Sequence, residues 1–112
     1  MLSSRLVFAL FWVLTATAGN AQPTIAVEPD AVRQKELVRL VRQDCGSCHG
    51  MTLHGGLGPA LLPATLQEKP FEGLVATIYY GRPGTPMPPW KRFMSEAEAA
   101  WIVQKLMSGF PQ

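Results

Sequence analysis

The chain has 112 residues and a formal net charge of +2, with ten lysine and arginine residues against eight aspartate and glutamate residues. This length allows one domain, and the small net charge gives no indication of a nucleic-acid partner. A domain of this size buries only about two-thirds of its unfolded surface, so an apolar core alone leaves a thin margin of stability.

The first 21 residues have the features of an export signal. Arg5 supplies a positive start, residues 6–14 form an unbroken apolar run, and small residues suited to a signal peptidase follow. We expect cleavage after Ala21, with a cut after Ala18 as the alternative. The apolar run is shorter than the ~20 residues needed to span a bilayer, so we expect no stable membrane anchor.

Residues 22–29 contain two prolines and no helical periodicity, which indicates an extended lead-in to the folded domain, residues 30–112. Asp30 is a good N-cap for a helix that we expect to run to about Asp44. The apolar side of this helix carries Leu37, Leu40 and Val41 at spacings of three and four. The sequence therefore predicts an amphipathic helix that leads into the segment described next.

Both cysteines of the chain stand beside a histidine in the stretch Cys45-Gly46-Ser47-Cys48-His49, and Cys-x-x-Cys-His is the attachment sequence of a c-type haem. On a helical turn, side chains three and four positions apart share a face, so both thiols can reach the two vinyl groups on one edge of a porphyrin. Each cysteine then forms a thioether, while His49 lies beneath the iron as an axial ligand.

Three other uses of these residues are weaker. A thioredoxin-like redox pair needs a βαβ context, and the surrounding sequence offers no strand of that kind. A zinc site needs a second pair of ligands, whereas the chain has no further cysteine and only His54 as a further histidine. A disulfide across two intervening residues closes a short loop and would add little stability.

A glycine-rich segment follows the cysteines. Four glycines lie within residues 50–58, and Pro59 comes next. This segment cannot form a stable helix, but it can wrap closely around a flat ligand. A second helix is predicted over residues 70–80, with Pro70 at its first position and Gly81 as its C-terminal cap.

Residues 81–90 contain four prolines and two glycines. Because proline fixes φ and lowers the entropy lost on ordering, this loop can present Met87 in one conformation without secondary structure. A capping box of Ser95 and Glu98 opens the last helix, which stops at Gly109. Its apolar side carries Trp101, Ile102, Val103 and Leu106. With no strand signal of useful length, the predicted fold is all-α.

These features resemble the class I, or mono-haem, cytochrome c family over essentially the whole mature chain. The resemblance rests on the Cys45-x-x-Cys48-His49 pattern, the Gly58-Pro59-x-Leu61 segment and the Pro86-Met87-Pro88 loop, set between a first and a last helix. It implies a cytochrome c fold, in which the N- and C-terminal helices cross. One covalently bound haem would then sit among short helices and loops with one edge exposed.

The resemblance also implies the remaining haem contacts. Met87 matches the distal iron ligand, and a soft thioether in that position favours Fe(II) and raises the potential. The alternative is that Met87 only fills an apolar gap, as most methionines do. The carbonyl of Pro59 matches the group that accepts a hydrogen bond from the proximal imidazole of His49. The less suitable methionines are Met51, Met94 and Met107.

Several further side chains have two interpretations each. Trp90, Tyr79 and Tyr80 would line the haem cavity or bond a propionate, or else be ordinary core and surface aromatics. Arg82 would pair with a propionate or be a solvated cation. His54 fits a surface side chain better than a competing ligand.

More narrowly, the segments around residues 44–53, 55–61, 81–90 and 95–103 look like those of cytochrome c55X. Members of that group accompany the periplasmic nitrite reductase that carries haem c and haem d. The resemblance implies an exported, monomeric electron carrier that performs no bond chemistry and delivers single electrons to that reductase. The alternative is a redox or assembly partner in haem d formation, and a haem enzyme such as a peroxidase is less well supported. Lys91 and Arg92 are candidates to steer an acidic partner, or else plain solvated cations.

Overall fold

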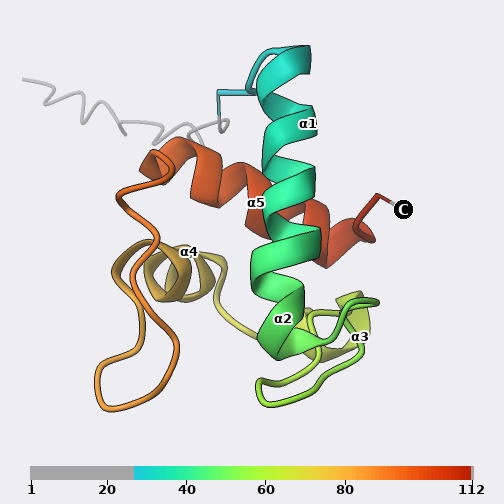
Figure 1. Ribbon diagram of the computed structural model, residues 1–112, viewed down its shortest axis with the longest axis vertical. Helices are drawn as coiled ribbons and strands as arrows, with labels where there is room; N and C mark the ends of the chain where they lie inside the picture. Colours follow the sequence, from blue (N-terminus) through green and yellow to red (C-terminus); the bar gives the residue numbers. More distant parts are fainter. Residues whose placement is uncertain (1–26, 112) are drawn as a thin grey trace, which may run out of the picture.

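The computed structural model describes residues 27–111. The expected signal peptide with both cleavage positions, and residues 22–26 of the lead-in, lie outside the described residues. Within residues 27–111 the chain forms helices and loops with no β-strand (Figure 1), so the predicted all-α fold class is confirmed. None of the helices in this described part is long and apolar enough to cross a membrane.

The first helix, α1 (Ala31–Leu40), begins as the sequence predicts. One carboxylate oxygen of Asp30 accepts hydrogen bonds from the backbone N–H groups of Val32 and Arg33, each at 2.9 Å. These bonds satisfy two of the donors that the first turn of a helix leaves unpaired. Asp30 therefore fixes where the helix starts.

The end of this helix differs from the prediction. The backbone stays helical beyond the predicted end at Asp44, through a π-helical turn, η1 (Val41–Cys45), and a last α-helical turn, α2 (Gly46–His49). Gly50, with a φ of 89°, then ends it. Single π-helical turns occur often at functional sites, and this one ends at Cys45, the first of the two cysteines. The cysteines and the histidine therefore stand on the end of one continuous helix.

Two helices form the middle of the chain. The short helix α3 (Pro63–Leu66) was not predicted, although its first residue is a proline in the position that helix starts favour. The helix α4 (Phe71–Tyr80) agrees with the prediction except that Pro70 lies at its N-cap and not at its first helical position. Gly81 caps its C-terminus as expected.

The last helix, α5 (Glu96–Ser108), has the predicted capping box. The side chain of Ser95 accepts a hydrogen bond from the backbone N–H of Glu98 at 3.1 Å, and the carboxylate of Glu98 accepts one from the backbone N–H of Ser95 at 2.7 Å. Gly109, with a φ of 104°, follows the helix. The two capping bonds satisfy the backbone N–H groups of Ser95 and Glu98, and so fix the start of α5.

The core lies where α5 crosses behind α1 (Figure 1), which is the crossing expected of a cytochrome c fold. The largest fully buried side chains are Leu37 of α1, Val41 of the adjoining η1, and Ile102 and Val103 of α5. Leu66 of α3 and Val75 of α4 belong to the same buried core. Apolar burial at the crossing thus holds the helix that ends in His49 against the rest of the domain.

Candidate haem site

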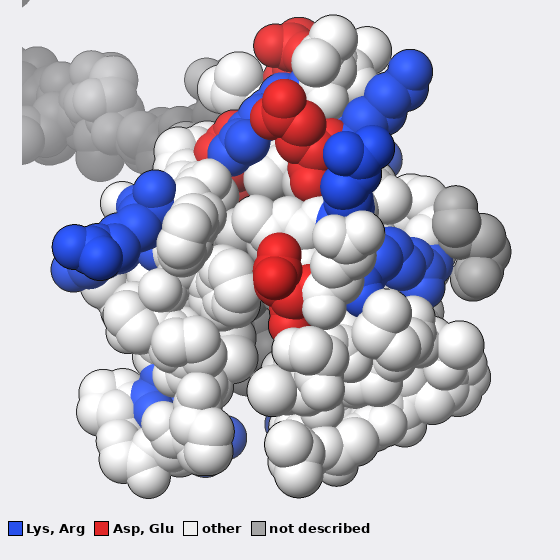
Figure 2. Space-filling model, viewed as in Figure 1, with Lys and Arg blue, Asp and Glu red and all other residues white. Residues whose placement is uncertain are grey.

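A hollow opens in the surface at the end of the continuous helix. Figure 2 shows it at the lower edge of that face, between two lobes. Figure 1 assigns one lobe to the loop after α4, residues 81–90, and the other to α2 with the loop that follows it, residues 50–62. The segments that carry the predicted haem anchors and the predicted distal ligand therefore border one hollow from two sides.

The two cysteines are not bonded to each other. Cys45 is half-buried and Cys48 is exposed. Burial, with a smaller contribution from the adjacent Asp44, raises the pKa of Cys45 to about 11. A thiol with so high a pKa is protonated at neutral pH and is a poor nucleophile, unlike the thiolate of a dithiol redox enzyme. Residues 27–111 also hold no cluster of three His, Cys, Asp or Glu side chains suited to a metal ion.

The ring of His49 is held in a defined orientation. Its Nδ1 lies 2.6 Å from the carbonyl oxygen of Pro59. Because a carbonyl only accepts hydrogen bonds, Nδ1 must carry the proton and donate it, which leaves the lone pair of Nε2 for a metal. The contact that the resemblance implied is therefore present, and it selects the tautomer that an axial iron ligand requires.

Gly58 lies against the face of this imidazole. A Cβ atom at Gly58 would stand 2.7 Å from Cε1 and 2.8 Å from Nδ1 of His49, closer than real contacts allow. Any larger residue would therefore require the ring or the backbone of Gly58 to shift. The sequence alone did not single out this role. The only signal was a glycine directly before the proline whose carbonyl the ring approaches.

The glycine-rich loop returns to the helix that it follows. The backbone N–H of Gly58 donates to the carbonyl of Cys48, and that of Gly55 donates to the carbonyl of His49, both at 2.8 Å. A helix leaves its last carbonyls without partners, and here the loop supplies them. The same bonds bring Pro59 back to the ring of His49.

The loop of residues 81–90 is built in a similar way on the end of α4. The backbone N–H groups of Trp90 and Lys91 donate to the carbonyls of Ile78 and Tyr79, at 3.0 and 3.2 Å. Gly81, with a φ of 72°, lies where this return is tightest, since a Cβ atom there would stand 2.6 Å from the nitrogen of Pro89. Only glycine fits both this backbone conformation and this space.

Met87 occupies the middle of that loop and is half-buried. Its backbone carbonyl accepts a hydrogen bond from the N–H of Arg82 at 3.0 Å, and its N–H donates to the hydroxyl of Thr85 at 3.3 Å. The other described methionines have different surroundings. Met94 belongs to the buried core, Met107 lies on α5 and packs against that core, and Met51 is 62% exposed. Met87 is thus the described methionine that is half-buried on the loop across the hollow from His49, whereas Met51 lies on the same side as His49 and is exposed.

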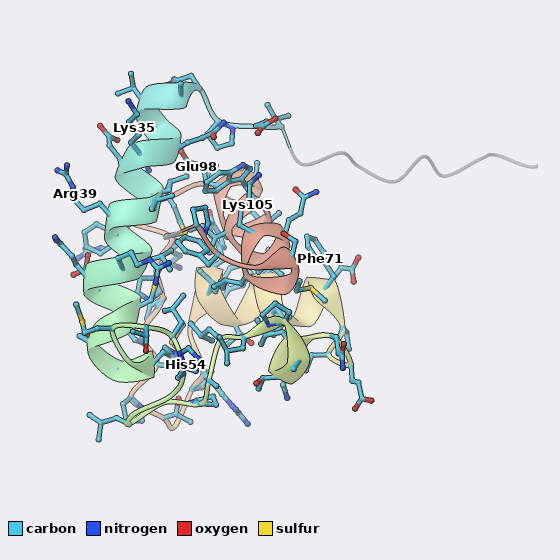
Figure 3. The ribbon with its side chains drawn as sticks, turned by 90° about the vertical axis from the view of Figure 1, so that its right-hand side faces the viewer. Lys35, Arg39, His54, Phe71, Glu98 and Lys105 are labelled. Carbon is cyan, nitrogen blue, oxygen red and sulfur yellow. The ribbon has the colours of Figure 1, made fainter. Side chains whose placement is uncertain are left out.

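The remaining candidate residues make contacts with neighbouring side chains or backbone, or are exposed. Trp90 is half-buried and its ring lies 5.6 Å from that of Phe93, whereas Arg82 is exposed. Tyr79 and Tyr80 pack edge to face on α4 with ring centroids 4.9 Å apart. His54 is exposed (Figure 3), and its Nδ1 lies 2.8 Å from the carbonyl oxygen of Thr52.

These residues fit a covalently attached haem. The segments that carry His49 and Met87 border the hollow from two sides (Figures 1 and 2), the tautomer of His49 is fixed by Pro59, and two unpaired cysteines lie on the same helical end as His49. A nitrogen ligand and a soft sulfur ligand on opposite sides of one space are the donors of a six-coordinate haem iron.

Known proteins resemble the chain at the level of sequence and of structure. Residues 32–104 match the family described as cytochrome c oxidase, cbb3-type, subunit III. Cytochrome c55X of Pseudomonas aeruginosa is 54% identical over 102 residues, which cover 90% of this chain and 86% of the relative. The solved structure of a c-type cytochrome, NirC, is 58% identical with a TM-score of 0.71, and the match covers 72% of this chain and 95% of that one.

A fourth similarity concerns a much longer protein. The dihydro-heme d1 dehydrogenase of Pseudomonas aeruginosa is 38% identical over 74 residues, which cover 65% of this chain but 15% of the relative. This match is therefore to one part of that enzyme. The family match spans more than half of the chain, and the match to cytochrome c55X spans nearly all of it. The chain belongs to the class I c-type cytochrome family and, within it, to the group of cytochrome c55X.

Proposed function

We propose that the protein is a periplasmic carrier of single electrons with one haem c, bound by thioethers to Cys45 and Cys48 and ligated by His49 and Met87. The observation that carries this proposal is the orientation of His49 beside two unpaired cysteines on one helical end. A haem held in this way gains and loses one electron at its iron. The chain keeps that iron shielded and its two ligands in place.

Each residue has a defined part in this proposal. Pro59 holds the proton on Nδ1 of His49 and makes the ring a better electron donor to iron. Met87 supplies a thioether, which favours the reduced state and fills the sixth position. With both axial positions taken by side chains no site remains for a substrate, which favours a carrier over a haem enzyme such as a peroxidase.

Replacement of the distal ligand tests the proposal directly. In the purified holoprotein, Met87→Ala should abolish the near-infrared sulfur-to-iron band of the oxidised form, lower the reduction potential and allow the reduced form to bind carbon monoxide. Met51→Ala is the matched control, because Met51 is exposed and lies two residues after His49. If the band and potential survive in Met87→Ala, Met94 becomes the ligand candidate and the proposed site is wrong.

The similarity to cytochrome c55X supports nitrite reductase as the electron acceptor, since that group accompanies the reductase with haem c and haem d. The similarity to part of a dihydro-heme d1 dehydrogenase favours a second candidate, a redox role in making the haem d of that reductase. Two experiments separate these roles. Rapid oxidation of the reduced protein by purified nitrite reductase, measured by stopped flow, supports the donor role. A gene-deletion strain whose nitrite reductase lacks haem d supports the maturation role.

Location is tested separately by cell fractionation. The proposal requires that the haem-bearing chain be recovered from the periplasm and that its N-terminus follow Ala21 or Ala18. Recovery from the cytoplasm with residues 1–21 intact would contradict it.

A further inference from the structure

Arg33, in the first turn of α1, contacts three separate parts of the chain. Its Nε donates to a carboxylate oxygen of Glu98 at 2.6 Å, and its Nη2 donates to the backbone carbonyl of Phe93 at 2.7 Å. Its Nη1 donates to Glu36, one turn further along α1, at 2.9 Å. Arginine can serve several acceptors at once because its five N–H donors form a rigid planar fork.

The pair of Arg33 and Glu98 is more than a surface ion pair. The Arg33 side chain is 31% exposed and that of Glu98 is 19% exposed. Figure 3 shows Glu98 between α1 and the start of α5. The hydrogen bond from Arg33 holds the pKa of Glu98 below its usual range, although burial acts in the opposite direction. The same carboxylate accepts the backbone N–H of Ser95, so one group joins α1 to the cap of α5.

The contact with Phe93 concerns the loop that carries Met87. This loop leaves α4 at Gly81 and is attached to the end of α4 through the backbone of Trp90 and Lys91. The carbonyl of Phe93 then accepts its bond from Arg33, and the side chain of the next residue, Met94, enters the core with 5% exposure. The far end of the loop is therefore fastened to α1 before α5 begins.

This contact ties the loop of Met87, the predicted distal ligand, to the helix that carries His49, the predicted proximal ligand. The backbone is helical without a break from Ala31 through α1, η1 and α2 to His49. Arg33 lies near one end of that helix, and His49 is its last residue. A rigid element with the proximal ligand at one end and a hold on the distal loop near the other can set the separation of the two ligands.

We propose that Arg33 is a positioning residue, which holds the loop of residues 81–95 against the helix of His49 so that Met87 stays on the iron. The proposal rests on the proposed function in taking Met87 as the ligand. Without this hold, the thioether would leave the iron under conditions in which the fold as a whole persists.

The test compares Arg33→Lys with Arg39→Lys in the purified holoprotein. Lysine keeps the positive charge beside Glu98, but one ammonium cannot also reach the carbonyl of Phe93 in the geometry of the guanidinium fork. Arg39 lies on the same helix with its side chain directed away from the domain, so it is a matched control (Figure 3). Arg33→Met is a second variant, in which the charge is lost as well.

Two midpoints are measured in guanidinium for each protein, one for loss of the near-infrared sulfur-to-iron band and one for loss of helical circular dichroism. We expect Arg33→Lys to lose the band at a lower concentration than its helices, to have a lower reduction potential, and to differ in both respects from Arg39→Lys. Arg33→Met should show the same separation more strongly. If both midpoints move together in the two Arg33 variants, Arg33 only stabilises the fold and the proposal is wrong.

Hydrogen exchange separates this outcome from a failure of the ligand assignment. Loss of one charged hydrogen bond should make the amides of residues 90–95 exchange about tenfold faster in Arg33→Lys, while those of α4 keep their rates. If the wild type lacks the sulfur-to-iron band, the assignment of Met87 is wrong whatever the exchange rates are. If the band is present but residues 90–95 exchange as in Arg39→Lys, the ligand assignment stands and the hold by Arg33 is refuted.

Discussion

The two loops that border the hollow are built alike and hold their predicted ligands differently. Residues 50–58 return to the carbonyls of Cys48 and His49, and residues 81–91 return to those of Ile78 and Tyr79. Both loops thus complete the end of the helix that they follow. The proximal ligand, however, stands on its helix, whereas the distal ligand stands in the middle of its loop.

Because of this difference, nearby residues fix the position of His49 more completely than that of Met87. The ring of His49 is bonded by Pro59 and contacted by Gly58, both within ten residues along the chain. Met87 is held through its backbone, and we propose that the bond between Arg33 and Phe93 holds its loop at a distance. We therefore expect the proximal side to tolerate loss of long-range contacts and the distal side to respond to them.

The two borders of the hollow also differ in charge. Residues 45–67 contain no lysine, arginine, aspartate or glutamate. Residues 73–95, on the other side, contain Arg82, Lys91 and Arg92 and no acidic residue. The border formed by residues 45–67 therefore has none of these charged side chains, and the border formed by residues 73–95 is basic.

The largest expected effect comes from removing an anchor of the proximal side. Cys48→Ser leaves His49 in place but removes one thioether, so we expect most of the holoprotein to be lost in a host that matures c-type cytochromes. Mass spectrometry after acid-acetone extraction measures the fraction of chain that retains haem. Ser47→Ala is the control, since it removes a hydroxyl that donates to the carbonyl of Asp44 at 2.7 Å and lies 3.9 Å from the Sγ of Cys48, while both cysteines stay in place. Equal haem retention in both variants would contradict covalent attachment at Cys48.

The next largest effect concerns the space beside His49. Gly58→Ala places a methyl group 2.7 Å from the imidazole, and overpacking of this kind costs ~1–3 kcal/mol. Gly73→Ala, within α4, has its nearest contact at 3.8 Å and should stabilise the protein by ~0.4–1 kcal/mol. Denaturant unfolding of the two holoproteins measures this contrast. A Gly58→Ala variant as stable as the wild type would show that the ring does not depend on that space.

The parts that could be predicted from the sequence are those with local causes. Three helix caps act within a few residues of their own position and lie where the sequence predicts them. They are Asp30, the capping box of Ser95 and Glu98, and Gly81. The predicted anchors, Cys45 and Cys48, belong to one short motif of known chemistry. Their cofactor class follows from the motif together with the family match.

The parts that could not be predicted depend on residues far apart in the chain or on unusual local geometry. Nothing in the sequence pairs Arg33 with Glu98, 65 positions away. The π-helical turn that ends at Cys45 has no distinctive composition, so the sequence predicts a helix that ends near Asp44. The short helix at Pro63 is one turn long, and periodicity cannot reveal so short an element.

A smaller effect follows from the pKa of Glu98. Arg33 holds that pKa below its usual range. Ionised Glu98 therefore stabilises the folded protein at pH values above ~4.3, the usual glutamate pKa, and this contribution disappears as the pH falls through the lower folded value. We expect Glu98→Gln to cost roughly 1–2 kcal/mol at pH 7, with the difference from wild type shrinking in acid.

The measurement is the free energy of unfolding of both proteins between pH 3 and about 7. Glu96→Gln is the control, because Glu96 lies exposed on the same first turn of α5. A difference between wild type and Glu98→Gln that stays constant down to the lowest pH would show that the ion pair with Arg33 does not supply this stability.

The smallest expected effect concerns the basic border and applies to an association rate. Lys91 and Arg92 are both exposed, and the ammonium of Lys91 lies 6.0 Å from the centre of the Tyr80 ring. If they steer an acidic partner to the hollow, Lys91→Glu with Arg92→Glu should slow association mainly through the on-rate. Added salt should reduce the wild-type rate, because charges more than about 8 Å apart are largely screened at ~0.15 M ionic strength.

Stopped-flow oxidation by nitrite reductase over a range of salt concentrations measures both effects. The control is Lys35→Glu with Arg39→Glu, which changes the net charge equally on the outer side of α1, where Figure 3 shows both side chains directed away from the domain. Steering by the basic border requires the first double variant to be slower than the second and less sensitive to salt. Equal rates in the two variants would assign the effect to net charge, and contact would then depend on the uncharged border, where Leu57 is 94% exposed.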